Sequence, residues 1–499
     1  MDQRLLLVLI FVVSTAQCQN NVQNSNVMIV KNETVNHVAT KTNETVPGPK
    51  LPSLCTICNC TDDTIDCEDR NLTDLFYGSQ WPNATFNLVS FQGNQLTFIK
   101  PFPKLHIKKL ILRNNKIMNI SHSAFKQLIN LTELDLSDNY LTSENLQPPA
   151  FEGRFSPDAY EPLAKLRVLN LANNELHSLH QDLFEHMSAL KVLNLSGNLF
   201  SKIDFTTSIA IDSIVELEEL DLSYCGLKSL SDTHFYSSFR VLKKLNLSGN
   251  QFTAPPSALE EAKTLKSLYM DENPMQIISG TQSFPRMPNL TELSLCCMPH
   301  LTVIGAGAFS GLRALEHLRI QNCPKLEAVD GYALAAQTES EGPMWPPLKK
   351  LDLSDNALRY LPEHFVARWD WLEELDLMNN KWSCDCNNQY LIRMLLPQYG
   401  KKLMGDDVNS LTCTEPPEHR GKKLTSLSNR NIRCLDVNGA QPEKDAMVLV
   451  GVLIGVMLAI PVCLTIFILW RRGFFFFGPQ GPADFSRAFY KRTANDDDF

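Results

Sequence analysis

Eight of the fourteen cysteines in this 499-residue chain stand in two tight clusters, a spacing that supports two different chemistries. The clusters are Cys55, Cys58, Cys60 and Cys67, and Cys384, Cys386, Cys413 and Cys434. Cys-x-x-Cys spacing is typical of zinc sites, whereas in an oxidising compartment such clusters form disulfides that hold small structures together. The choice therefore depends on where the chain resides and on what lies between the clusters.

Other patterns that carry catalysis or ligand chemistry are missing from the sequence. It contains no Gly-x-Ser-x-Gly nucleophile, no phosphate-binding loop and no His-Glu-x-x-His zinc motif, and its eleven histidines are dispersed. The net charge is −9, and no block of lysine and arginine is long enough to bind nucleic acid. We therefore expect no enzyme, no metal, no cofactor and no nucleic-acid partner.

One repeated sequence phrase fills the chain between the two cysteine clusters. It predicts the secondary structure that lies between them. The phrase is Leu-x-x-Leu-x-Leu-x-x-Asn, as in Leu131 to Asn139, and it occurs twelve times with conservative replacements. It predicts leucine-rich repeats that stack into an α/β-type solenoid. A curved parallel β-sheet would form the concave face, and irregular or short helical segments would form the convex side. The leucines would point inward and the residues between them outward, because side chains alternate along a strand.

Two repeats are longer than the others because each contains a polar insert with proline. The inserts run roughly from Thr142 to Pro162 and from Ala333 to Pro347. Insertions in solenoids emerge as loops on one face and often bind partners. The alternative is that the inserts are surface loops without a function, which the fold tolerates at little cost in stability.

Two apolar runs predict the topology. Leu5–Val13 is too short to span a bilayer and is followed by small residues, which is typical of a signal peptide over residues 1–16. The uncharged run 446–470 is long enough to cross a membrane, and Arg471 and Arg472 after it place that end in the cytoplasm. A single-pass type I plasma-membrane protein is predicted. Its extracellular part would lie in an oxidising environment, which favours disulfides over zinc in the two cysteine clusters.

Between and around these runs the chain divides into eight expected segments. They are the signal peptide 1–16, a disordered glycosylated leader 17–53, an N-terminal cap 54–85, repeats 86–380, a C-terminal cap 381–435, a linker 436–445, a transmembrane helix 446–470 and a tail 471–499.

Ten Asn-x-Ser/Thr sequons agree with an extracellular location for the repeats. They are Asn32, Asn43, Asn59, Asn71, Asn83, Asn119, Asn130, Asn194, Asn246 and Asn289. Asn194 and Asn246 fall on concave strands, so glycans there would obstruct the central concave surface. The alternative is that Asn-Leu-Ser is a common spelling of the phrase and that occupancy is partial.

The cysteine spacing resembles the flanking caps of extracellular leucine-rich-repeat proteins. In those caps the first cysteine pairs with the third and the second with the fourth. The resemblance implies the pairs Cys55–Cys60, Cys58–Cys67, Cys384–Cys413 and Cys386–Cys434. The stretch Arg70-Asn71-Leu72-Thr73 is similar to the trophoblast-glycoprotein family, which implies modulation of signalling or adhesion, including signalling of the Wnt type.

Four further cysteines lie inside the repeats. Cys225 and Cys323 occupy the Asn slot, where cysteine is an accepted alternative, so we expect buried thiols there. Strand alternation points Cys296 outward onto the concave face. Cys297 lies on the turn just before the slot, and a disulfide to Cys323 is an alternative to a free thiol.

The variable concave positions are the candidate ligand-binding residues. The candidates are Asp135, Asp221, Tyr269, Arg319, Asp352, Glu374 and Asp376. Their acidic members would steer a protein ligand with basic patches. The alternative is a solvated face that only keeps the protein soluble.

Two classes of function remain. The leading hypothesis is a cell-surface receptor or adhesion molecule that recognises an extracellular protein through the solenoid. The alternative is an accessory subunit of another membrane protein, such as an ion channel. Gly451-x-x-x-Gly455 in the predicted span suggests a homodimer. The C-terminal Phe499 resembles a PDZ-domain ligand, against the alternative of a solvated acidic end.

Overall fold

The computed structural model describes residues 54–82, 84–153, 163–230, 238–338, 342–434 and 442–472. They belong to two compact units, Met1–Ile432 and Arg433–Phe499. The predicted signal peptide, the leader and the sequons Asn32, Asn43 and Asn83 lie outside the described residues. So do the tail from residue 473, including Phe499, and parts of both inserts and of the linker.

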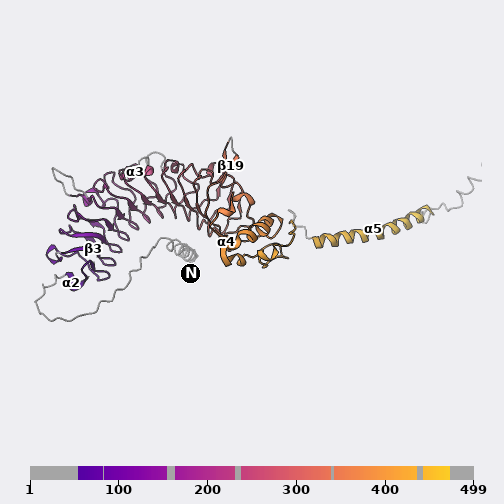
Figure 1. The fold of residues 1–499 in the computed structure, drawn as a ribbon, viewed down its shortest axis with the longest axis horizontal. Helices are drawn as coiled ribbons and strands as arrows, with labels where there is room; N and C mark the ends of the chain where they lie inside the picture. The colour runs from indigo at the N-terminus through magenta and orange to yellow at the C-terminus, as the bar shows by residue number, and fades with distance from the viewer. Residues whose placement is uncertain are drawn as a thin grey trace, which may run out of the picture. The chain divides into compact units, whose positions relative to one another are not determined.

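One sheet of fourteen short strands extends from Asn59 to Asp376 (Figure 1). Its first two strands pair antiparallel, and every later neighbour pairs parallel. In sheet order the strands are β1 Asn59–Cys60, β2 Thr64–Asp66, β3 Thr85–Ser90, β5 His106–Ile111, β7 Glu133–Asp135, β8 Val168–Asn170, β9 Val192–Asn194, β10 Glu219–Asp221, β11 Lys244–Asn246, β12 Ser267–Tyr269, β14 Glu292–Ser294, β16 His317–Arg319, β20 Lys350–Asp352 and β21 Glu374–Asp376. The predicted fold class, a leucine-rich-repeat solenoid, is confirmed.

The leucines of the phrase form the core, as the alternation predicts. Leu131, Leu134 and Leu136 are all buried, and every other repeat has the same pattern. Burying one leucine side chain contributes about 1.5–3 kcal/mol relative to leaving it in water. A single repeat cannot bury these side chains alone, so the turns must stack.

The Asn slot joins each turn to the one before it. In the case of Asn139, the side-chain Oδ1 accepts a hydrogen bond from the Ile117 N–H at 3.0 Å. Its Nδ2 donates to the Leu112 and Leu136 carbonyls, both at 3.1 Å. Cys225 and Cys323 fill the same slot, and each thiol donates to a carbonyl of the preceding turn at 3.3 Å. The residue before the slot has a left-handed backbone conformation, with positive φ, in every turn from Asp69 to Asn379. The repeat phrase alone does not predict this regularity.

The return side of the solenoid is built from shorter pieces. Two small sheets lie there, with strands β4 Phe98–Ile99 and β6 Asn119–Ile120, and β13 Ile277–Ile278, β15 Val303–Ile304 and β17 Ala328–Val329. The helix α3 Phe205–Asp212 replaces the extended return in one repeat, and the Asp204 carboxylate caps it by accepting from the Thr207 N–H. Phe125 and Phe151 stack with ring centroids 5.8 Å apart.

The two inserts differ. The described part of the first includes a 3-10 turn, Pro148–Phe151, which buries Phe151 in the core. The second forms a hairpin of β18 Ala336–Thr338 and β19 Gly342–Met344 that stands on the convex side in Figure 1.

Disulfides hold both caps. The structure joins Cys55 to Cys60, Cys58 to Cys67 and Cys384 to Cys413, which are pairs that the resemblance implies. Cys386 and Cys434 are also disulfide-bonded. The zinc alternative is therefore wrong for these clusters, because a disulfide sulfur is not a thiolate ligand. A short α2 Leu54–Ile57 begins the first cap; α4 Lys401–Met404 and a π-helical segment Leu391–Gly400 lie in the second.

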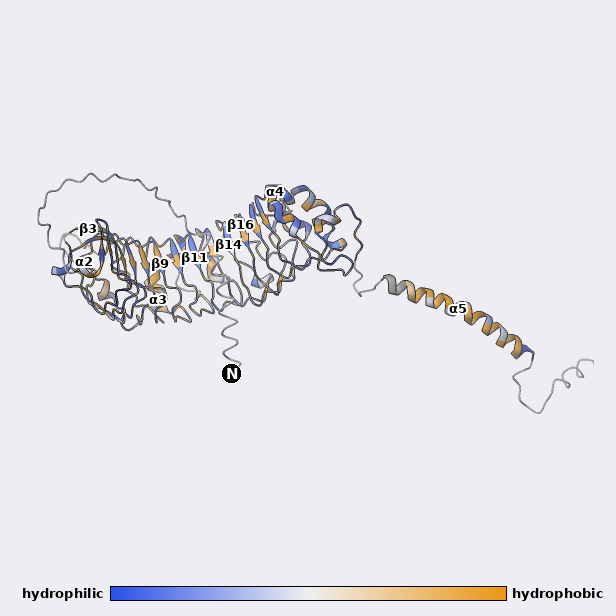
Figure 2. Cartoon of the chain, turned by 90° about the horizontal axis from the view of Figure 1, so that it is seen from below, coloured by the Kyte–Doolittle hydropathy of each residue, from blue (hydrophilic) through white to orange (hydrophobic). Residues whose placement is uncertain are grey.

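The second unit contains the helix α5 Pro442–Arg471. Its stretch Ala446–Arg471 is long and apolar enough to cross a membrane, and Figure 2 shows hydrophobic residues along most of it. This is the segment that the sequence predicts as the span.

Candidate functional site

The outward residue in the middle of each phrase forms one continuous row across the large sheet. Pairing places Asp135, Asn170, Asn194 and Asp221 side by side, strand after strand. The same register continues through Asn246, Tyr269, Ser294, Arg319, Asp352 and Asp376. We call this the concave row. It holds six of the seven predicted ligand-binding residues, and Glu374 lies two residues before Asp376 on β21.

The acidic and amide members of the concave row also stabilise the end of their own strand. Asp135 Oδ1 accepts from the Ser137 N–H at 2.9 Å and from the Ser137 hydroxyl at 2.6 Å. Asp221 and Asp352 bind the serine two residues on in the same way. This local turn uses one carboxylate oxygen of each residue. Their residue type therefore has a structural reason besides any ligand.

Ion pairs neutralise much of the acidity predicted for this face. Lys109 pairs with Glu133 and Lys350 pairs with Glu374, each with the ammonium nitrogen 2.8 Å from a carboxylate oxygen. Lys244 lies 3.8 Å from Glu219. All of these pairs join neighbouring strands in register. The face is thus mixed in charge over most of its length.

The middle of the concave row carries its largest side chains. The Lys244 ammonium lies 5.6 Å from the centroid of the Tyr269 ring, within range of a cation–π contact. Burial raises the pKa of the Tyr269 hydroxyl, and the charge of Glu292 raises it further. Tyr269 and Arg319 are half-buried and stand two strands apart, separated by the small, buried Ser294. Tyrosine and arginine are among the residue types most enriched at energetically dominant interface contacts.

Several carboxylates lie close together at the C-terminal end of the concave row. Burial raises the pKa of the Asp376 carboxyl, and the neighbouring carboxylates Asp352, Asp355 and Asp407 raise it further. Asp407 comes from the C-terminal cap, in the 3-10 segment Gly405–Ser410. The repeat phrase does not predict this contribution from the cap, because Asp407 lies outside the repeats.

Two residues near Tyr269 do not lie where strand alternation places them. The sequence predicts that Cys296 faces outward, and strand alternation would place Asp271 on the same side, but only 3% and 5% of their respective surfaces are exposed. Asp271 Oδ1 accepts from the Cys296 N–H at 2.6 Å and from the Ser294 hydroxyl at 2.7 Å. The prediction fails because β12 ends at Tyr269 and β14 at Ser294, so alternation no longer applies two residues later.

The remaining repeat cysteines divide into buried thiols and one disulfide. Cys225 and Cys323 are buried free thiols, as predicted, and burial raises the pKa of each to about 12. Cys297 is disulfide-bonded, whereas Cys323 is not. The alternative of a Cys297–Cys323 bond is therefore wrong.

Seven sequons lie within the described residues, and their surroundings differ. Asn59, Asn71, Asn119 and Asn289 are exposed, whereas Asn130, Asn194 and Asn246 are half-buried. The Asn246 amide donates to Asp221 Oδ2 at 3.0 Å and stands directly beside Tyr269 in the sheet. From residue 290 onward the chain contains no sequon. The row from Ser294 to Asp376 therefore has no glycan acceptor of its own. Within the described ranges, no group of three or more His, Cys, Asp or Glu side chains could hold a metal ion.

Comparison with known proteins identifies the repeat. The family profile described as Leucine rich repeat matches residues 106–153, 163–209 and 215–275. The chain is 31% identical to CD180 antigen of Mus musculus over 166 residues, 33% of this chain and 23% of that protein. It is 24% identical to the leucine-rich repeat transmembrane protein FLRT2 of Rattus norvegicus over 409 residues, 77% of this chain and 50% of that protein. The chain spans about half the length, 54%, of the similar podocan of Mus musculus.

Two solved structures are also similar. One is the octameric complex of latrophilin 3, Unc5D and the repeats of FLRT2, with 22% identity, 74% of this chain and 96% of that chain covered, and a TM-score of 0.41. The other is human trophoblast glycoprotein, with 20% identity, 78% and 100% covered, and a TM-score of 0.36. Together with the register, the buried phrase and the bonded cysteines, the matched repeats show that the chain is a leucine-rich-repeat solenoid with disulfide-bonded caps and, within the described residues, one candidate membrane span.

Proposed function

We propose that the protein is a single-pass type I receptor or adhesion molecule of the plasma membrane that binds an extracellular protein with the C-terminal half of its concave row. The observation that carries the proposal is the in-register run of outward side chains from Tyr269 through Arg319 to Asp376. It presents an aromatic ring, a guanidinium and carboxylates on one rigid sheet, and only Asn246 at its edge is a glycan acceptor.

The chemistry of this run suits a protein partner. Tyr269 and Arg319 supply rigid, amphipathic contact area, and binding energy at protein interfaces concentrates in such residues. Asp352 and Asp376 at the far end attract a basic patch and guide its approach. The similarity to FLRT2 supports the same class of function, since the repeats of FLRT2 form a complex with latrophilin 3 and Unc5D.

The test is a binding screen with the full-length chain displayed on cells against a library of soluble extracellular proteins. For a protein that binds, Tyr269→Ala and Arg319→Ala are each expected to weaken binding at least tenfold, the effect of losing about 1.4 kcal/mol or more. Asn170→Ala, in the same row on β8, is the matched control and should change binding less than twofold. Equal losses at all three positions would contradict the assignment of the C-terminal half.

The candidate span supports a second function. The α5 helix is apolar over Ala446–Arg471, and at both Gly451 and Gly455 an added Cβ would have open space around it. Small residues at this spacing let a second helix approach closely, either from another copy or from a multispan protein. Replacing the span with an unrelated apolar helix should abolish co-purification of such a partner and leave binding through the concave row unchanged. If the unrelated span co-purifies the partner equally well, the accessory-subunit function is rejected.

A further inference from the structure

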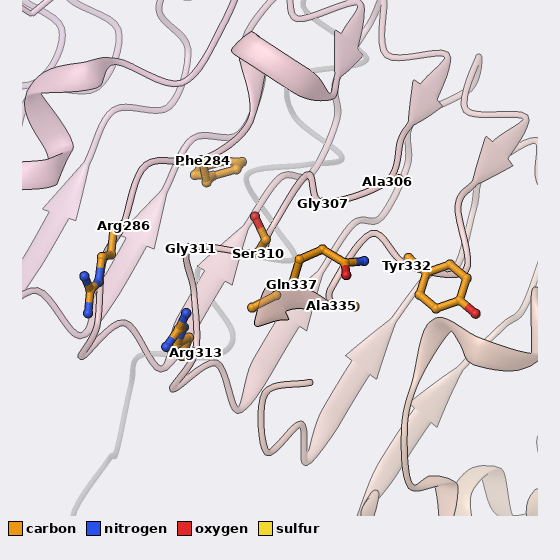
Figure 3. Close-up of a pocket in the computed structure, with 11 residues that line it drawn as sticks. Phe284, Arg286, Ala306, Gly307, Ser310, Gly311, Arg313, Tyr332, Ala335 and Gln337 are labelled. Carbon is orange, nitrogen blue, oxygen red and sulfur yellow. The ribbon is translucent and has the colours of Figure 1, made fainter. Parts of the chain in front are cut away.

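A cavity of about 540 Å³ opens away from the concave row, on the segments that lead back toward β14 and β16. Arg286 and Arg313 lie toward one end of it and Tyr332 toward the other, with Ser310 and Gln337 between them (Figure 3). Its size lies within the range of roughly 300–1,000 Å³ that is usual for ligand pockets.

The second insert forms one wall of this cavity. Ala335 and Ala336, at the foot of the hairpin, are almost completely buried, and Gln337 of β18 lines the opening. The far side of the hairpin is fixed to the next repeat, because the Trp345 indole N–H donates to the His364 carbonyl at 2.9 Å. Trp345 also packs against Tyr332, with ring centroids 6.0 Å apart. This anchoring argues against the alternative that the insert is a surface loop without a function.

The charge of the cavity is opposite to that of the chain. The protein has a net charge of −9, yet the described residues that line the cavity include two arginines and no acidic residue. Both arginine side chains are exposed, and among the ion pairs of the described residues neither has a carboxylate partner. Planar guanidinium groups bind carboxylates through two parallel hydrogen bonds. The Ser310 hydroxyl and the Gln337 amide add neutral hydrogen-bond donors at the same opening.

The rest of the lining is apolar or small. Tyr332 is 41% exposed and offers part of its ring, and the alanines and glycines let a peptide backbone approach closely. An anion with no apolar part would leave this surface uncovered. The lining therefore fits an acidic side chain that is followed by an apolar one better than it fits a free inorganic anion.

We propose that this cavity binds an acidic peptide segment of an extracellular protein, with the carboxylate between Arg286 and Arg313 and a neighbouring apolar side chain against Tyr332. This inference rests on the proposed function in one respect only, that the natural ligand is a protein.

The test uses the full-length chain in nanodiscs and the fluorescein-labelled peptide Gly-Leu-Glu-Glu-Leu-Gly, followed by fluorescence anisotropy. A peptide with glutamine in place of both glutamates is the neutral control and should bind at least tenfold more weakly. Arg286→Gln and Arg313→Gln should each weaken binding at least fivefold, while the double lysine variant should retain part of it. The control is Arg240→Gln, since Arg240 is also exposed and, like Arg313, stands two residues before the first leucine of its repeat.

Several results would overturn the proposal. Equal binding of the neutral peptide, or unchanged binding by both glutamine variants, would show that the arginines do not recognise a carboxylate. Tighter binding of a heparin hexasaccharide, with the same dependence on both arginines, would replace the peptide by a sulfated glycan. If the peptide fails to bind while a protein partner still requires Tyr269, the cavity proposal alone is rejected. If the peptide binds but the screen finds no partner, the proposed function alone is rejected.

Discussion

The two halves of the concave row are built on the same repeat but carry different side chains. From Asp135 to Asn246 every member is Asp or Asn, and these residues close the end of their own strand by accepting from the residue two positions on. In the second half Tyr269 and Arg319 occupy the same position. Both sequons of the row, Asn194 and Asn246, lie in the first half. The difference indicates that this position of the phrase serves the scaffold throughout the first half, whereas in the second half Tyr269 and Arg319 leave it free to contact a partner.

The largest expected effect comes from adding a glycan to the second half of the concave row. Asp352→Asn turns Asp352-Leu353-Ser354 into the Asn-Leu-Ser sequon that already occurs at Asn194 and Asn246. A glycan there would exclude a partner from β16, β20 and β21. We expect binding to fall on the order of a hundredfold, which corresponds to about 2.7 kcal/mol.

The matched control is Asp135→Asn, which creates the same sequon in the first half and should change binding less than twofold. Glycan occupancy is checked by mass spectrometry. Enzymatic removal of the glycan from the Asp352→Asn variant, by an amidase that leaves aspartate in place of the glycosylated asparagine, should restore binding. Loss of binding by both variants would contradict the difference between the halves.

The next effect concerns stability in the second half. Burial raises the pKa of the Asp271 carboxyl, so the folded protein holds this proton more tightly than the unfolded chain does. The contribution of Asp271 to stability is therefore complete below the unfolded pKa and is lost as the pH rises through the folded pKa. Asp271→Asn removes the buried charge and should stabilise the protein at pH 7.5 by about 1 kcal/mol, because an unpaired buried charge is costly.

Thermal unfolding at pH 4.5 and pH 7.5 measures this effect. The gain in Tm should be larger at pH 7.5 than at pH 4.5. Asp406→Asn is the control, because Asp406 is exposed in the cap and its replacement should change Tm at neither pH. An equal gain at both pH values would show that the buried charge is not the cause.

A smaller effect is expected from removing the native sequons one at a time. Asn246→Gln removes the acceptor beside Tyr269 and should strengthen partner binding about threefold if the site is occupied, a change of roughly 0.6 kcal/mol. Asn194→Gln, two strands further from Tyr269, should leave the affinity unchanged. A gain at Asn194 alone would move the binding site to the first half.

The smallest effect is kinetic. Lys350→Met frees the Glu374 carboxylate from its ion pair, which should raise the association rate of a basic partner about twofold at low salt and less at high salt. Lys109→Met breaks the equivalent pair with Glu133 in the first half and should not change the rate. Thermal stability should be unaffected in both variants, because exposed ion pairs contribute little.

The sequence predicts the solenoid well because one short-range rule, alternation with a fixed phrase, is repeated in every turn. The same rule places Tyr269, Arg319 and the aspartates correctly on the outward side. It fails at Asp271 and Cys296, where the strand has ended and the chain turns inward. It also does not predict contacts between side chains on neighbouring strands, such as Lys109 with Glu133, or the position of Asp407 of the cap near Asp376. These contacts depend on which side chains meet in the folded protein. The cavity beside the hairpin depends on the fold in the same way, so the sequence does not predict it.

The buried thiols of Cys225, Cys296 and Cys323 affect how this protein must be produced. Folding takes place where the cap cysteines are being oxidised, and an unfolded chain exposes all of these thiols to the same oxidant. Thiolates are the reactive form, and burial raises the pKa of all three, so packing protects them. The repeats around them must therefore pack before oxidation reaches them. A slowly folding variant would accumulate mispaired, disulfide-linked chains even if its native state were fully stable.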